Sequence, residues 1–243
     1  MNPITIIPAR MAATRLPGKP LAEIGGLPMI VQVLRRAEAA GVGPVAVAAG
    51  DSEIVEAVER AGGRAVLTDP ALPSGSDRIR AALAELDPDG RHDLVINLQG
   101  DMPLIPPQTV RALVDLFEAH PQLHMGTLVA PESSPADRSN PDVVKAVLSL
   151  AREAKAGRAL YFTRSTLYGA EPVWRHIGLY GYRPDALERF TAARPTPLER
   201  REKLEQLRAL ELGVEIWAAI VDEAPVSVDT PADLEAARRA SAG

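Results

Sequence analysis

The first half of the chain alternates short apolar runs with amphipathic stretches, and this alternation constrains the fold more than any other feature. The apolar runs lie at residues 5–7, 45–49, 65–67 and 94–98. The stretches with helical spacing of apolar residues lie at 29–40, 52–61, 77–86 and 110–119. Strands that alternate with helices favour right-handed crossovers and a parallel sheet. We therefore predict an α/β fold with a doubly wound, mostly parallel sheet and a ligand crevice at the carboxyl ends of its strands.

The second half is less regular. We expect strands at 125–131, 143–150, 176–182 and 214–221, and helices at 198–212 and 231–239, whereas residues 159–165 fit no single element. A turn-rich stretch covers 131–141. We interpret the 243 residues as one domain, with a small inserted α+β subdomain at roughly 130–185.

Charge and cysteine content exclude several classes of function. The formal net charge is −5, so no basic excess is available to bind a nucleic acid or an anionic membrane surface. The chain has no cysteine, which excludes disulfides, thiolate catalysis and cysteine-bound metals. No apolar run approaches the roughly 20 residues of a membrane span, and the first residues lack a secretory pattern. We expect a soluble, cytoplasmic protein.

A cationic loop follows the first predicted strand. Arg10, Arg15 and Lys19 lie within it, in a chain that is acidic overall. Cations that meet over a loop can neutralise a polyphosphate, and Gly18 allows the backbone to approach it closely. The loop is not a P-loop, because Gly18-Lys19 is followed by Pro20 and not by Ser or Thr. The alternative is a basic loop that is simply solvated.

Carboxylates follow two later predicted strands. Asp101 comes directly after the strand 94–98, and Asp229 lies just before the last predicted helix. Carboxylate oxygens are ligands for Mg²⁺, although Gly100-Asp101 also fits a plain turn. Asp233 fits a helix-capping role better than a metal-binding one. A cationic loop together with two strand-end carboxylates is what nucleoside-triphosphate chemistry requires.

Several segments, taken in chain order, resemble one known family. They are the stretch 6–21 with Leu-Pro-Gly-Lys-Pro-Leu, Ser-Gly-Ser-Asp-Arg at 74–78, Gln-Gly-Asp at 99–101, Arg-His-Ile-Gly-Leu-Tyr-Gly-Tyr-Arg at 175–183, Leu-Glu-Gln-Leu-Arg at 204–208 and Val-Asp-Thr-Pro at 228–231. In this combination the chain resembles the 3-deoxy-manno-octulosonate cytidylyltransferases, also called CMP-Kdo synthetases. The resemblance extends over nearly the whole chain.

The resemblance implies both a reaction and an assembly. Family members have a nucleotide-diphospho-sugar transferase-like fold and transfer CMP from CTP to the anomeric hydroxyl of 3-deoxy-D-manno-octulosonate (Kdo), with release of pyrophosphate. The product serves lipopolysaccharide biosynthesis. The resemblance further implies a Mg²⁺-dependent homodimer, in which the inserted subdomain at roughly 130–185 serves sugar binding and dimerisation.

Residue roles follow from the resemblance by position. Arg10, Arg15 and Lys19 would bind the triphosphate, and Asp101 and Asp229 would bind Mg²⁺; Lys19, Arg15 and the two aspartates form the catalytic set. The remaining nucleotide contacts would be Ala9, Ser74, Gly75, Arg78 and Gln99. The sugar contacts would be Gln99, Arg164, His176, Tyr180, Glu205 and Gln206. For His176, which lies in an apolar strand, a core position is the alternative.

The chain departs from the family pattern at three places. Met102 stands where a glutamate usually follows the Gln-Gly-Asp aspartate, and Ala49-Gly50 precede Asp51 where a Thr-Asp pair is usual. Residues 166–169 replace a segment that usually contains proline. Two alternative functions therefore stay open: a cytidylyltransferase for another acidic sugar or a sugar alcohol, and a nucleotide-binding module without activity.

Overall fold

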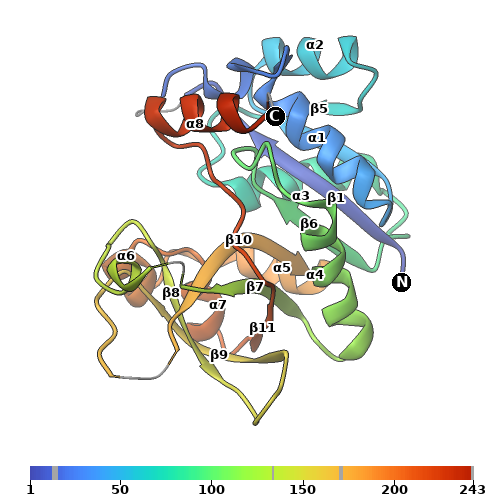
Figure 1. The fold of residues 1–243 in the computed structure, drawn as a ribbon. Coiled ribbons are helices and arrows are strands. Elements are labelled where there is room, and N and C mark those ends of the chain that lie inside the picture. Colours follow the sequence, from blue (N-terminus) through green and yellow to red (C-terminus); the bar gives the residue numbers. More distant parts are fainter. Residues whose placement is uncertain (13–15, 133, 170–171, 242–243) are drawn as a thin grey trace. The chain divides into compact units, whose positions relative to one another are not determined.

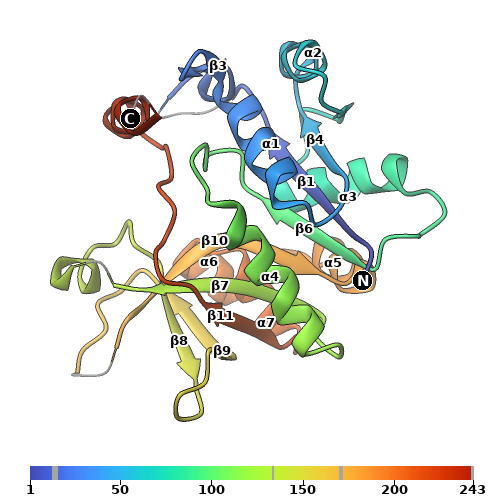
Figure 2. The same ribbon diagram turned by 45° about the vertical axis from the view of Figure 1, so that its right-hand side comes forward.

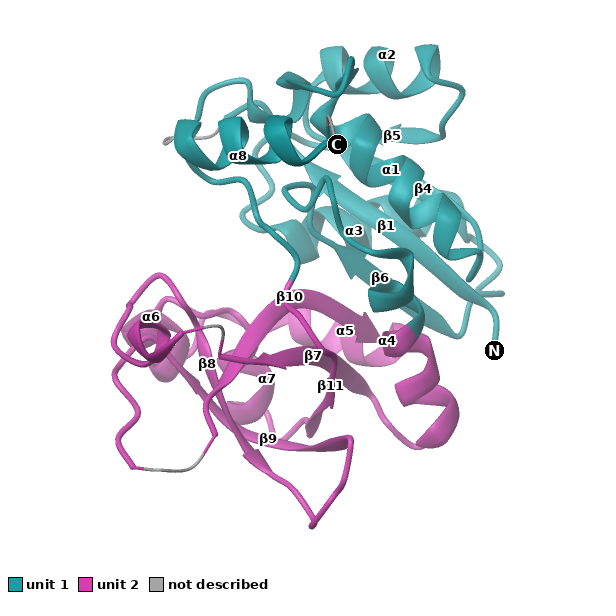
Figure 3. Cartoon of the chain, viewed as in Figure 1, with its two compact units in different colours: residues 1–111, 225–243 teal, residues 112–224 magenta. Residues whose placement is uncertain are grey.

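The computed structural model describes residues 1–12, 16–132, 134–169 and 172–241. It divides the chain into two compact units, which Figure 3 shows in different colours. Unit 1 contains Met1–Arg111 and Pro225–Gly243, and unit 2 contains Ala112–Ala224. Helix α4 (Pro107–Ala119) runs across the boundary. No described helix combines the length and the apolar character that a membrane crossing needs.

Unit 1 is built on four parallel strands, as the alternating pattern predicts, and Figure 1 shows helices around these strands. In spatial order they are β5 (Ala65–Leu67), β4 (Val45–Ala49), β1 (Pro3–Ala9) and β6 (Leu94–Leu98), and every neighbouring pair is parallel. The other elements are η1 (Lys19–Leu21), β2 (Glu23–Ile24), β3 (Leu27–Pro28), α1 (Met29–Ala40), α2 (Ser52–Arg60), α3 (Gly75–Leu86) and α8 (Pro231–Ser241).

Helices cover the sheet of unit 1 because its central strands are apolar throughout. Every residue of β1 and β6 is buried, which requires cover on both faces. Helices α1 and α3 both pack against β1 and β4, and Figure 2 shows α1 running alongside β1. Helix α1 ends at Gly41, whose φ of 65° lies in the left-handed region that glycine adopts without strain.

The C-terminal segment belongs to unit 1 and packs against β2 and the start of α1. An apolar cluster joins Val228, Leu234 and Ala237 to Ile24 and Met29, with Leu16, Ala22 and Leu104 packed against it. Thr230 and Asp233 cap α8 reciprocally: the Asp233 carboxylate accepts from the Thr230 backbone N–H at 2.8 Å, and the Thr230 hydroxyl oxygen accepts from the Asp233 N–H at 3.2 Å. The predicted capping role of Asp233 is confirmed.

The sheet of unit 2 is mixed. Its strands, in the order in which they pair, are β10 (Trp174–Tyr182), β7 (Met125–Pro131), β11 (Ile216–Ile220), β9 (Ala156–Thr163) and β8 (Lys145–Ser149). Among these strands, β7 and β11 pair in parallel and the other pairings are antiparallel. Because β10 also pairs with β8, the five strands form a closed ring of pairings. The α/β class is confirmed. The main sheet of unit 1 is parallel, whereas most strand pairings in the sheet of unit 2 are antiparallel.

The prediction of one continuous helix at 198–212 in unit 2 is wrong. The predicted helix 198–212 consists of α6 (Pro197–Glu202) and α7 (Gln206–Glu211). Lys203 lies between them with φ 55°, a left-handed conformation that ends a right-handed helix. The remaining elements of unit 2 are η2 (Pro135–Arg138) and α5 (Pro184–Ala192), and residues 159–165, left unassigned from sequence, belong largely to β9. The predicted insertion at 130–185 lies within unit 2.

Candidate active site

The strand ends of unit 1 surround a pocket of about 400 Å³. Because β1, β4 and β6 are parallel, their carboxyl ends meet at one edge of the sheet, and the loops that follow them supply most of the lining. The lining includes every described residue that the sequence assigns to the nucleotide or the metal, namely Ala9, Arg10, Lys19, Ser74, Gly75, Arg78, Gln99, Asp101 and Asp229. Arg15 lies outside the described residues.

Lys19 joins the two candidate metal-binding carboxylates. Its Nζ lies 3.3 Å from Asp101 Oδ2 and 3.1 Å from Asp229 Oδ1, and it also donates to the Val228 carbonyl at 3.0 Å. The two carboxylate oxygens are therefore at most about 6.4 Å apart, the sum of the two ion-pair distances. Residues separated by most of the chain thus meet around one ammonium group.

Backbone contacts hold this arrangement in place. The Val228 N–H donates to the Asp101 carbonyl at 2.8 Å, which joins the loop after β6 to the segment before α8. Gly100 lies close to the end of β1, since a Cβ there would be 3.0 Å from the Pro8 carbonyl oxygen. Burial raises the pKa of Asp101; Lys19 opposes the shift and Asp229 adds to it. Lys19 thus supplies the positive charge that keeps two neighbouring carboxylates compatible.

Arg78 also lines the pocket. Its side chain is buried, and Nη1 donates to the Thr68 hydroxyl at 2.5 Å and to the Asp69 carbonyl at 3.1 Å. Its Nη2 is buried without a hydrogen-bond partner among the described residues, so a donor remains for a ligand. Gly50 makes room for this guanidinium, because a Cβ at that position would lie 2.9 Å from Nη1. The departure from the family pattern at Gly50 therefore lies directly against the pocket.

Asp51 contacts the cationic loop, although the sequence interpretation gave it no role. Its Oδ2 accepts a hydrogen bond from the Met11 backbone N–H at 2.7 Å, which fixes the beginning of the cationic loop. Asp51 follows β4, so the rule that found Asp101 at a strand end would also have found it.

Met102 is another position where the chain departs from the family pattern. Its side chain is only 4% exposed and belongs to the core, where a carboxylate would be costly to bury.

The candidate sugar-binding residues other than Gln99 lie in unit 2, where aromatic rings form a continuous series. The His176 ring lies 5.0 Å from that of Phe162 and 5.4 Å from that of Tyr180. Burial raises the pKa of Tyr180 well above its usual value, with contributions from Tyr182 and from the carboxylate of Glu205. His176, Tyr180 and Glu205 therefore lie near one another.

The Thr127 hydroxyl contacts the His176 ring and two backbone carbonyls. The Thr127 hydroxyl lies 3.1 Å from the Ile177 carbonyl, 2.9 Å from the Leu179 carbonyl and 3.1 Å from His176 Nε2. The hydroxyl has one proton to donate and an oxygen that accepts, and which of the two faces Nε2 depends on the tautomer of the His176 ring.

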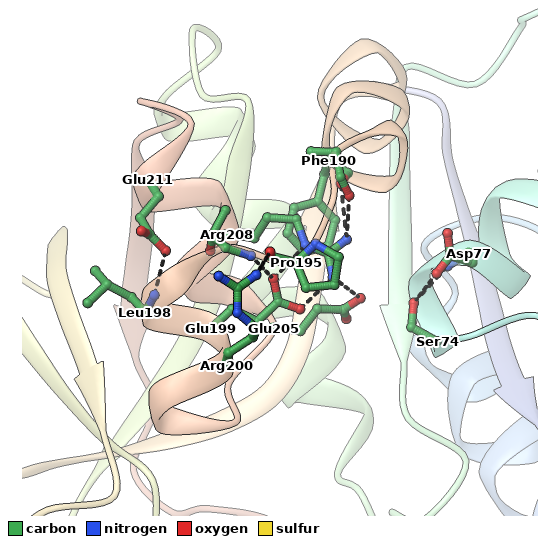
Figure 4. A network of polar contacts seen from close by, with 12 residues as sticks. Ser74, Asp77, Phe190, Pro195, Leu198, Glu199, Arg200, Glu205, Arg208 and Glu211 are labelled. Carbon is green, nitrogen blue, oxygen red and sulfur yellow. Dashed lines mark hydrogen bonds and ion pairs between the residues drawn. The ribbon is translucent and has the colours of Figure 1, made fainter.

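Glu205 is held by a buried network around Arg208, shown in Figure 4. Arg208 donates to both carboxylate oxygens of Glu199, at 2.8 and 2.6 Å, and lies 3.5 Å from Glu205 Oε1. Its guanidinium also stacks over the Phe190 ring at 4.8 Å. The same view labels the bond from the Ser74 hydroxyl to Asp77, which belongs to the cap of α3 in unit 1.

The two other predicted sugar contacts of unit 2 are Arg164 and Gln206. Arg164 donates from Nη1 to the Pro141 carbonyl at 2.9 Å and lines a second pocket, of about 680 Å³. The fully buried Lys145 donates to the Arg164 carbonyl at 2.8 Å, and burial, then Arg164, lowers the pKa of this lysine. Gln206 is buried, and its Nε2 has no hydrogen-bond partner among the described residues.

We expect His176 to remain neutral at acidic pH. Burial lowers its pKa from 6.5 to about 3. Because the folded-state pKa lies below the unfolded one, the stability contribution of neutral His176 is fully present above pH 6.5 and is lost as the pH falls toward about 3. NMR titration of the ring carbons should show no protonation of His176 at pH 5, with His176→Gln used to assign the signal. A midpoint near 6.5 would contradict this.

The fold and the pocket at its strand ends point to a nucleotide-binding transferase, and residues 4–216 match the family model described as cytidylyltransferase. A protein of Parvibaculum lavamentivorans named 3-deoxy-manno-octulosonate cytidylyltransferase is 57% identical over 242 residues, covering 99% of this chain and 93% of the relative. A protein of the same name from Rhodospirillum centenum is 58% identical over 238 residues, covering 98% and 92%. The chain belongs to the family of 3-deoxy-manno-octulosonate cytidylyltransferases.

Solved structures agree with this assignment. A structure described as CMP:2-keto-3-deoxy-manno-octonic acid synthetase complexed with CTP superposes with a TM-score of 0.91 at 36% identity, covering 100% of this chain and 99% of that one. A cytidylyltransferase from Leptospira borgpetersenii has a TM-score of 0.64 at 17% identity, covering 98% and 85%, which is a likeness of fold alone. The family resemblance predicted from the sequence is confirmed.

Proposed function

We propose that the chain transfers CMP from CTP to the anomeric hydroxyl of Kdo, giving CMP-Kdo and pyrophosphate. One observation of the structure supports this most directly: Arg10, Lys19 and Arg78 line one pocket together with Asp101 and Asp229. Cations suit a triphosphate, and paired carboxylates suit the metal that accompanies it. Membership in the family supplies the identity of the sugar.

The reaction requires that the protein position the two substrates and stabilise the charge that develops on the leaving group. The sugar hydroxyl attacks the α-phosphorus in line with the departing pyrophosphate, so no covalent intermediate with the enzyme forms. Arg10, Arg15 and Lys19 hold the triphosphate and stabilise the charge that develops on the leaving group. Ala9, Ser74, Gly75 and Arg78 surround the base, as the resemblance implies.

The residues present fit a magnesium ion. Within the described residues, no group of three or more His, Asp or Glu side chains is placed to hold a metal, so an ion at Asp101 and Asp229 needs further oxygens. Mg²⁺ commonly uses one or two carboxylates together with substrate phosphates and water, which agrees with such a pair. When bound, Mg²⁺ neutralises phosphate charge and polarises the phosphorus centre.

Several finer features belong to the same proposal. The strand order of unit 1, which reverses after β5, supports a doubly wound sheet, in which the crossover helices cover both faces. Residues 130–185 form the inserted subdomain that serves sugar binding and dimerisation. The enzyme works as a homodimer in the cytoplasm and supplies activated sugar for lipopolysaccharide biosynthesis.

Pyrophosphate release across a panel of acidic sugars tests the function. We expect release only when CTP, Mg²⁺ and Kdo are all present. Release with a sialate or a sugar alcohol in place of Kdo would favour the related cytidylyltransferases. CTP binding without release for any sugar would favour a nucleotide-binding module without activity.

A further inference from the structure

The ammonium group of Lys19 is saturated by protein oxygens. It has three N–H donors, and three acceptors lie around it: Asp101 Oδ2 at 3.3 Å, Asp229 Oδ1 at 3.1 Å and the Val228 carbonyl at 3.0 Å. The side chain is only 16% exposed. While this arrangement holds, no donor of Lys19 remains for a phosphate oxygen.

The same three oxygens are the donor set that a hard divalent cation prefers. Two are carboxylates from different segments, and the third is a backbone carbonyl adjacent to one of them. Two close carboxylates repel each other unless a cation lies between them. In the free protein Lys19 Nζ provides that cation.

We propose that the Lys19 ammonium occupies the position of the metal between Asp101 and Asp229 in the free protein, and that it leaves this position when nucleotide and metal bind. An ammonium and a divalent cation repel each other at such short range, so both cannot occupy the space between Asp101 and Asp229. The incoming triphosphate offers new acceptors to the displaced ammonium. This inference rests on the proposed function, because it takes the two aspartates as the metal ligands.

The backbone around Lys19 suits such an exchange. Gly18 has φ 69° and lies directly before η1, and Pro20 within η1 is buried. Lys19 is thus anchored at its Cα, whereas its four-carbon side chain keeps several rotatable bonds. Rotation of that side chain suffices for the exchange.

The displacement of Lys19 couples the binding of the nucleotide to the binding of the metal. A metal that binds the free protein must displace Lys19 with no new partner to receive it, whereas a metal that arrives with a triphosphate provides one. Nucleotide and metal should therefore bind with positive coupling, each strengthening the other by the same factor. Lys19 keeps the aspartates together for the metal and discourages metal binding before the nucleotide is present.

Mn²⁺ binding to the nucleotide-free protein, followed by the electron paramagnetic resonance of free Mn²⁺, tests the proposal. Lys19→Met should bind Mn²⁺ at least about tenfold more tightly than the wild type, since the competing charge is gone. Arg10→Met is the matched control: Arg10 lines the same pocket, and the described residues show no ion pair between it and either aspartate. It should change Mn²⁺ affinity by less than about twofold, through the general field alone.

Two results would overturn the exchange. One is equal or weaker Mn²⁺ binding by a folded Lys19→Met protein, and the other is an equal gain in Arg10→Met. If Lys19→Met does not fold, Lys19→Gln, which keeps polarity and removes the charge, replaces it. Adding Asp101→Asn to Lys19→Met should remove the gained site. No gain in Mn²⁺ affinity, with pyrophosphate release from CTP and Kdo intact in the wild type, would refute the exchange and leave the proposed function standing.

Discussion

Asp101→Asn should lower kcat for pyrophosphate release by at least about 10³-fold, because the substitution removes a charged oxygen from the pair proposed to bind the metal. Asp229→Asn should lower kcat by a similar factor. The substitution is isosteric, and Lys19 and the Val228–Asp101 backbone bond remain, so the fold should persist. Steady-state kinetics at saturating CTP and Kdo measure the effect, and circular dichroism checks the fold.

Asp51→Asn provides the comparison. Asp51 is a strand-end aspartate of the same unit that contacts the Met11 backbone, and it is not a proposed metal ligand. Its substitution should lower kcat far less than either change at the metal pair. Near-normal kcat in Asp101→Asn or in Asp229→Asn would show that the pair does not hold the catalytic metal.

Arg208→Met should lower the free energy of unfolding by about 3–5 kcal/mol, because it leaves the Glu199 carboxylate buried without its bidentate partner. The side chains of Arg208 and Glu199 are 6% and 11% exposed, so water cannot replace the lost bonds. The double variant Arg208→Met with Glu199→Leu should recover much of the loss, since no uncompensated charge remains. Urea unfolding measures all three proteins.

An exposed pair in the same unit serves as the control. Arg158 and Glu215 lie 3.1 Å apart with side chains 50% and 60% exposed, and Arg158→Met should cost less than about 1 kcal/mol. If Arg208→Met cost no more than Arg158→Met, the network in Figure 4 would not hold α6 and α7 together.

In the wild type, burial acts to raise the pKa of Glu199, but the hydrogen bonds from Arg208 and from the Thr196 N–H outweigh it and lower the pKa. This contribution to stability is therefore present above the usual Glu pKa and is lost as the pH falls.

The pocket at the strand ends of unit 1 was predictable because it follows from a rule about chain topology. Once strands and helices alternate, loops after successive strands must gather at one edge, and Arg10 and Asp101 fall on such loops. The same rule covers Asp51, which the sequence interpretation left without a role. The prediction that Asp229 follows the end of a strand is wrong, because the preceding strand, β11, ends at Ile220. Asp229 reaches the pocket through the apolar cluster that includes Val228 and Leu234, which packing between distant segments forms.

Unit 2 was less predictable because its sheet is not built from repeated crossovers. Local periodicity indicated most of its strands, but the antiparallel order and the ring closed between β8 and β10 depend on pairings between distant segments. The split of the expected helix at Lys203 also had no local signal, because lysine is an ordinary helix former.

By itself the amino-acid sequence determined the α/β class, the cationic and acidic loops and, through its motifs, the family. Apolar periodicity and residue spacing are properties of neighbouring positions, so a sequence shows them directly. Only the tertiary structure decided that Lys19 lies between Asp101 and Asp229, that Thr127 contacts His176 and that Arg208 pairs with Glu199. These contacts join residues brought together by packing, and their distances follow from how whole elements fit against one another.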